Sequence, residues 1–204
     1  MSKTPNIVAF AGDVCIAAGD LSCVALAAQK AIAAGMAAGM AAERHDPVLL
    51  FDARTSEPVE LDLRGSRDDV LRRLPPAAAP EQEVSRGPGR PKLGVVPREV
   101  TLLPRHWDWL GSQPGGASVA LRKLVENAMR SNTSKDRMRA AQNAAYKFMS
   151  VMAGNRPGFE EASRALFAAD AQKFSQLISA WPKDIGDHLK TLAADAMKAE
   201  ESAA

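Results

Sequence analysis

Residues 97–130 read PREVTLLPRHWDWLGSQPGGASVALRKLVENAMR, and this stretch decides the fold of the central part of the chain. We predict one strand over Arg98–Leu103, ended by a proline that opens a helix over Arg105–Gln113. A Pro-Gly-Gly turn ends that helix, and a second helix starts at Ser118, or at the Gly116-Ala117 step before it, and runs to about Arg130. One strand and two short helices leave strand backbone unpaired and bury little surface. The economical solution is a two-fold dimer in which the two strands pair antiparallel.

The strand–helix–helix order resembles the ribbon-helix-helix family of bacterial DNA-binding proteins, whose two-stranded ribbon lies in the major groove. The resemblance implies a DNA-binding homodimer or higher even oligomer, with a phosphate at the free amides of the turn before the second helix. The DNA-contacting residues predicted in this segment are Arg98, Val100, Leu102, Arg105, Gly115, Gly116, Ser118, Arg122 and Lys123. Strand alternation places Arg98, Val100 and Leu102 on one face, and apolar side chains read base edges poorly. The alternative is a ribbon that only dimerises.

A basic arm precedes this segment, where residues 86–92 read RGPGRPK. The arm resembles an AT-hook, in which a Gly-Arg-Pro core lies in a narrow A·T minor groove. Pro88 stands where the motif's first arginine would be, so half of the hook is missing. The resemblance implies A·T-leaning DNA contacts from Arg86, Gly89, Arg90, Pro91 and Lys92. The surrounding Pro75–Gly94 is rich in proline, glycine and charge, which predicts an extended linker.

Charge is distributed unevenly along the 204 residues, although the whole chain has a net charge of only +2. Residues 86–139 hold eleven Lys or Arg and four Asp or Glu, a net charge of +7. The flanking segments 1–85 and 140–204 have net charges of −4 and −1. A basic middle third between acidic flanks is either an anion-binding footprint or a mixed, solvated surface.

The outer regions predict an α+β protein. Before the linker we expect hairpins of Ile7–Phe10 with Val14–Ala18 and of Val48–Asp52 with Val59–Leu63. A helix from Asp20 or Ser22 to about Ala34 and a short one capped by Ser66 complete a small ββαββα domain. After a polar break at Ser131–Ser134, apolar stripes predict a C-terminal helical bundle. The predicted division is 1–75 (α+β domain), 76–95 (basic linker), 96–132 (ribbon-helix-helix-like segment) and 133–204 (helical domain).

Several classes of function find no support in the residues. Two cysteines, Cys15 and Cys23, exclude a disulfide framework and a cysteine-rich zinc site. The three histidines lie in different regions without metal-ligand spacing, and neither a phosphate-binding loop nor a nucleophile motif occurs. We therefore expect a protein that is not an enzyme and has no metal or cofactor. The N-terminus lacks the order of a signal peptide, and the alanine-rich run at 23–42 is too weakly apolar to span a membrane.

Longer stretches are similar to a bacterial family known as domain-of-unknown-function family 2239. They are residues 89–128, the run RAAQNAAYKFMSVMAGNRPGFEEASRALFAADAQKFSQLISAWPKDI over 139–185, VAFAG at 8–12 and PVLLFDARTSEPVELDLRGS at 47–66. The Ala/Gly/Met run at 35–42 is a departure from that pattern in a loop. The resemblance spans nearly the whole chain and implies a bacterial cytoplasmic protein, but it brings no established activity.

Together, these patterns predict a DNA-binding protein, either a transcriptional regulator or a nucleoid-associated protein. The N- and C-terminal domains would serve oligomerisation or sensing. The alternative is a non-enzymatic interaction or oligomerisation scaffold, or a ligand-sensing module, that does not bind DNA.

Overall fold

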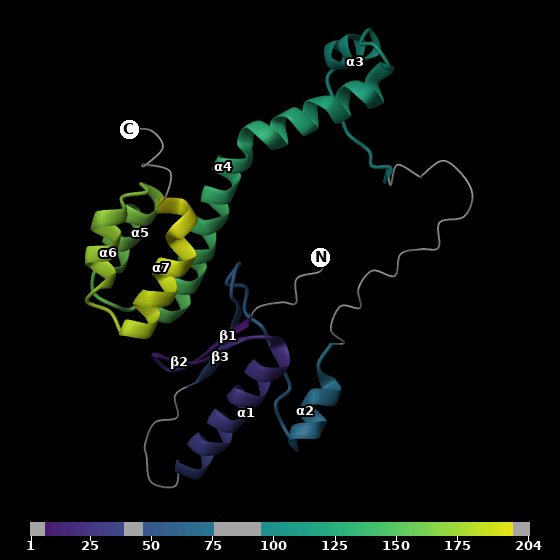
Figure 1. The fold of residues 1–204 in the computed structure, drawn as a ribbon. Helices are drawn as coiled ribbons and strands as arrows, with labels where there is room; N and C mark the ends of the chain where they lie inside the picture. The colour runs from purple at the N-terminus through teal and green to yellow at the C-terminus, as the bar shows by residue number, and fades with distance from the viewer. Residues whose placement is uncertain (1–6, 39–46, 76–94, 198–204) are drawn as a thin grey trace. The chain divides into compact units, whose positions relative to one another are not determined.

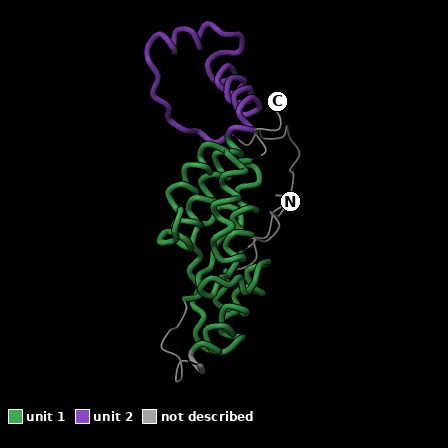
Figure 2. The backbone as a smooth tube through the Cα atoms, turned by 90° about the vertical axis from the view of Figure 1, so that its left-hand side faces the viewer, with its two compact units in different colours: residues 1–80, 136–204 green, residues 81–135 purple. Residues whose placement is uncertain are grey.

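The computed structural model describes residues 7–38, 47–75 and 95–197, which form a mixed α+β fold that is mostly helical (Figure 1). The elements in chain order are β1 (Ile7–Ala11), β2 (Val14–Gly19), α1 (Leu21–Ala38), β3 (Val48–Asp52), α2 (Arg67–Arg73), α3 (Pro104–Gly111), α4 (Gly116–Ala153), α5 (Phe159–Phe167), α6 (Ala171–Ile178) and α7 (Lys183–Met197). They fall into two compact units, shown in Figure 2. Unit 1 comprises residues 1–80 and 136–204, and unit 2 comprises residues 81–135.

Unit 1 is built on an antiparallel sheet of three strands in the order β2-β1-β3. The central strand β1 is apolar along its length because both of its faces are covered. Successive side chains alternate between the faces, so Ile7 and Ala9 face one layer while Val8 and Phe10 face the other. The sheet is thus the middle layer of three.

Helix α1 covers the face that carries Ile7, Ala9 and Leu50. Val24 and Ala28 pack on these side chains and are fully buried. The helix begins there because the Asp20 carboxylate accepts hydrogen bonds from the amides of Ser22 and Cys23, each at 3.1 Å. These hydrogen bonds and those from the side chains of Cys23 and Ser22 lower the pKa of Asp20 to about 2.

The C-terminal helices cover the opposite face, so segments far apart in the sequence share one core. Phe148 of α4 lies 5.1 Å from the ring of Phe10 and 5.3 Å from that of Phe51. Polar contacts join the same layers, since the Asp184 carboxylate accepts a 2.9 Å hydrogen bond from the Cys15 amide. The described residues of the predicted segment 1–75 and those from Asp136 onward in the predicted segment 133–204 therefore share one core in unit 1.

The structure differs from the predicted elements at three places in the described chain. Val59–Leu63 is not a strand, because only Pro58 forms a bridge with β3, so the N-terminal region has three strands and the predicted ββαββα order is wrong. Arg98–Leu103 is not a strand either, because no strand of the described chain pairs with its backbone. Ser131–Ser134 does not break the helix. The hydroxyls of Ser131 and Thr133 donate to carbonyls of the preceding turn, and α4 continues through them.

Within the described residues, no helix combines the length and the apolar composition needed to cross a membrane.

Candidate nucleic-acid interface

Unit 2 contains the predicted DNA-contacting segment, and its described residues have very little core. Only Leu110 and Ala120 are buried among residues 95–135. The large apolar side chains that stay exposed there are Val95, Val96, Val100, Leu103, Trp107, Trp109, Leu124, Val125 and Met129. Monomeric proteins rarely expose so many large apolar side chains over so short a stretch. Unit 2 therefore leaves an unusually large part of its apolar side chains exposed in the single chain.

A small apolar hollow of about 280 Å³ marks the place where this core is incomplete. It is lined by Leu102, His106, Trp109, Leu110, Leu121 and Leu124. Leu102 is half-buried against this hollow, whereas Arg98 and Val100 are exposed. The three residues predicted on one strand face therefore have different environments in a single chain.

The turn between α3 and α4 has the geometry that its two glycines allow. Gly115 and Gly116 have φ angles of +86° and +74°, values that L side chains rarely adopt. A Cβ atom on Gly115 would lie 3.1 Å from that of Val119, so the turn also passes close to the helix it precedes. Helix α4 starts at Gly116 with no acidic residue in its first turn. Its N-terminal amides and the positive end of its dipole thus meet no carboxylate of that turn.

Four of the predicted cations lie in unit 2 without an ion pair in the described part of the chain. They are Arg98, Arg105, Arg122 and Lys123, and all four are exposed. Arg122 and Lys123 lie in the second turn of α4, near its amino end and Ser118. By contrast, Arg130 further along the helix pairs with Glu126 at 3.6 Å. Two of these four cations, Arg122 and Lys123, therefore lie where a helix N-terminus already favours an anion.

The predicted arm residues Arg86, Gly89, Arg90, Pro91 and Lys92 lie outside the described residues. Among the residues that are described, no group of three or more His, Cys, Asp or Glu side chains is placed to hold a metal ion.

Sequence reasoning missed a cavity of about 1280 Å³ in unit 1, beside the edge strand β3. The alternation of apolar and polar residues over Val59–Leu63 predicts a strand there, and a complete hairpin would leave less open space at this edge. The departure of this segment from β3 after Val59 is a tertiary feature that the pattern does not contain.

One family model matches residues 6–193, and its description reads "Uncharacterized protein conserved in bacteria (DUF2239)". No curated protein matches the chain, and no solved structure matches it.

Proposed function

Because the chain belongs to this uncharacterized bacterial family, whose description assigns no activity, we propose a function from its own residues: it binds DNA as a two-fold dimer. The observation that carries the proposal is the turn of Gly115 and Gly116, which opens α4 next to two unpaired cations, Arg122 and Lys123. Backbone amides and basic side chains at a helix N-terminus are a common phosphate site in DNA-binding proteins. The role is that of a transcriptional regulator or a nucleoid-associated protein in the bacterial cytoplasm, without catalysis or a cofactor.

The dimer follows from the unfinished core of unit 2. Two copies of the extended segment Arg98–Leu103 pair antiparallel, which satisfies the backbone groups that one copy leaves open. The same pairing covers the apolar hollow that contains Leu110 and the exposed side chain of Leu124. Leu124 is 46% exposed in one chain, so Leu124→Glu is tolerated by the monomer and opposes the dimer. Light scattering should give a dimer for the native chain and a monomer for this variant, with Leu71→Glu on α2 as the control.

DNA contacts are mainly electrostatic in this proposal. Arg122 and Lys123 bind phosphates, and Arg90 in the arm follows the narrow minor groove of A·T-rich DNA. Affinity is therefore strongly salt-dependent, while sequence specificity is modest because Val100 and Leu102 offer no hydrogen bonds to base edges.

A gel-shift titration on A·T-rich and G·C-rich duplexes at two salt concentrations tests the proposal. Neutralising Arg122 and Lys123 should weaken binding to both duplexes and flatten the salt slope by about 0.9 for each phosphate that the variant no longer neutralises. The matched control neutralises Arg164 and Lys173, which are also exposed but lie on α5 and α6 of unit 1. Arg90→Ala should cost about 1 kcal/mol more on A·T-rich DNA.

If the chain does not bind either duplex at about 50 mM salt, where phosphate contacts are strongest, it is not a DNA-binding protein. The second candidate is then an interaction scaffold, favoured by the exposed apolar side chains of unit 2. That candidate predicts self-association through the same apolar surface, with no dependence on Arg122 or Lys123.

A further inference from the structure

The strand β3 is an edge of the sheet in unit 1, and its outer side is only half covered. Its inner side pairs with β1 along all five residues. On the outer side, the Asp52 amide donates to the Glu57 carbonyl, and the Leu50 carbonyl accepts from the Val59 amide, each at 2.9 Å. Outward-facing positions alternate along an antiparallel strand, so Val48 is the next one. In the described part of the chain, no backbone group pairs with the outer side of Val48.

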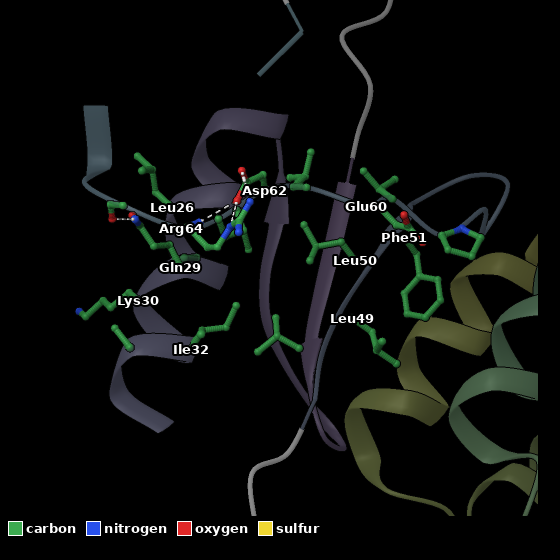
Figure 3. A pocket seen from close by; sticks show the side chains of 18 of the residues that line it. Leu26, Gln29, Lys30, Ile32, Leu49, Leu50, Phe51, Glu60, Asp62 and Arg64 are labelled. Carbon is green, nitrogen blue, oxygen red and sulfur yellow. Dashed lines mark hydrogen bonds and ion pairs between the residues drawn. The ribbon is translucent and has the colours of Figure 1, made fainter. Parts of the chain in front are cut away.

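The cavity of about 1280 Å³ opens beside this edge, and we name it the β3 cleft. Helix α1 forms one wall with Leu26 and Ile32, and residues 58–65 form the other. In Figure 3, Leu50 points toward α1, whereas Phe51 points toward the helices on the far side of the sheet. The cleft exceeds the range of about 300–1000 Å³ that is usual for small-ligand pockets. It also runs along a strand, so an elongated occupant fits it better than a compact one.

The walls of the β3 cleft are mostly aliphatic, and its rim is charged. Arg64 pairs with Asp62 at 2.8 Å, and this contact holds the pKa of the Asp62 carboxyl well below its usual range. Lys30 and Arg67 line the cleft too, and neither has an ion pair within the described residues. Glu60 lines the cleft as well and has no ion pair either, so the unpaired rim charges in the described part of the chain are two positive and one negative, a net charge of +1.

We propose that the β3 cleft binds an extended, acidic peptide segment of another protein, whose backbone pairs with the outer side of β3 at Val48, next to the part of the edge that residues 57–59 already cover. An open strand edge recognises such a segment through main-chain hydrogen bonds, and pockets on its flanks select alternate side chains. A peptide offers both the donor and the acceptor that the outer side of Val48 requires. A purely aliphatic ligand of the same length would leave those groups unsatisfied.

The chemistry of the segment follows from the walls. Side chains facing α1 meet Leu26, Ile32 and Leu50, so they are aliphatic at every second position. The positions between them are acidic rather than basic, because Lys30 and Arg67 outweigh Glu60 among the rim charges that have no ion pair in the described chain. The chain's own Val59–Leu63, which reads VELDL, has this pattern, and its first residue is the one that donates to β3. This binding site lies in unit 1 and is independent of the proposed DNA contacts.

The test uses a fluorescently labelled peptide of sequence PVELDL and the full chain, with binding followed by fluorescence anisotropy. Val48→Pro removes the outward amide, while the inner ladder with β1 keeps its hydrogen bonds at the neighbouring positions. Ile32→Glu places a like charge in the apolar wall. Leu71→Glu is the matched control, because Ile32 and Leu71 are both 37% exposed and Leu71 does not line the cleft.

We expect saturable binding that both cleft variants weaken at least about tenfold, while Leu71→Glu leaves it unchanged. Hydrogen exchange should show that added peptide slows the amide of Val48. Retained β1 protection in the variants shows that the sheet is still folded, and if Val48→Pro unfolds it, Ile32→Glu decides. Equal binding of a scrambled peptide such as PLVDEL, or no effect of either cleft variant, overturns the proposal. So does a Val48 amide that is already protected without peptide, since the chain's own residues 60–63 then close the edge.

Discussion

Phe148→Ala tests whether the sheet and the C-terminal helices unfold as one unit. Phe148 is fully buried in α4. Its ring lies 5.1 Å from Phe10, 5.3 Å from Phe51 and 4.5 Å from His188, so it packs against β1, β3 and α7 together. A change at this position of α4 should therefore destabilise strands that precede Phe148 by about 96 to 141 residues.

The magnitude follows from burial. Replacing a buried phenylalanine by alanine costs about 3–5 kcal/mol, because less apolar surface is buried and a cavity is left behind. Aromatic pairs are worth about 0.5–1.5 kcal/mol each beyond their buried area, so we expect a cost in the upper part of this range, about 4–5 kcal/mol. A domain is stable by only about 5–15 kcal/mol. Phe148→Leu, which keeps most of the volume and should cost about 1–2 kcal/mol, is therefore the variant to use if the alanine variant does not fold.

Urea unfolding followed by circular dichroism reports on the helices, and hydrogen exchange of the Val8 and Phe10 amides reports on the sheet. The free energy of unfolding should fall by the same amount in both measurements. Phe167→Ala is the control, because Phe167 is 50% exposed and its one aromatic ring partner in the described chain is Tyr146, at 5.5 Å; this substitution should cost less than about 1 kcal/mol. Unchanged protection of β1 in the Phe148 variants would refute a shared core and restore two separate domains.

Three further predictions concern single residues. Burial lowers the pKa of His188, whose Nε2 has no hydrogen-bond partner in the described chain, so this imidazole stays neutral in the folded protein at a pH where it binds a proton in the unfolded protein. The free energy of unfolding should therefore fall as the pH drops below about 6.5, by up to about 1.4 kcal/mol per pH unit. In urea titrations His188→Gln should flatten this slope, and the exposed His106→Gln is the control. The buried Gln142 side chain donates hydrogen bonds to the carbonyls of Leu166 and Phe167, at 3.1 and 3.3 Å, and Gln142→Met removes this donor. The free energy of unfolding should fall by about 1–3 kcal/mol, whereas Gln176→Met, at an exposed position, should leave it unchanged. Gly116→Ala should destabilise the start of α4 by about 1–2 kcal/mol, the cost of a left-handed backbone at a residue with a side chain. Gly115→Ala should cost more than this, because its new methyl group would also crowd Val119. Equal hydrogen-exchange rates of the Val119 amide in the two variants would contradict this difference.

Most helices and strands could be predicted from the sequence, because residues close together in the chain fix where each element begins and ends. Pro104 opens α3 at its first position, and the Ser66 side chain forms a capping box with Asp69 at the start of α2. Asp170 likewise caps α6 by accepting from the Lys173 amide. The α+β fold class and the membership of an uncharacterized bacterial family could also be predicted from residue patterns alone.

The candidate interface in unit 2 could be predicted from the sequence only in part. Glycines and cations stand at fixed places along the chain, so the turn at Gly115 and the neighbouring Arg122 could be chosen from sequence. Arg98–Leu103 has the residue pattern of a strand, yet it forms none in the single chain, because a strand needs the backbone of a partner strand and the local pattern does not supply one.

Tertiary structure alone decided which segments share a core and where the sheet ends. Val59–Leu63 has the alternation of a strand, yet the ladder stops at Val59, while Arg73 of α2 donates a 3.0 Å hydrogen bond to the Asp62 carbonyl. Ser131–Ser134 has the composition of a break, yet α4 passes through it. The periodicity of apolar residues predicts which side chains are buried, but it does not predict which other residues they pack against. That choice depends on packing between residues far apart in the chain, such as Phe10 with Phe148, and it created both the shared core of unit 1 and the open edge at Val48.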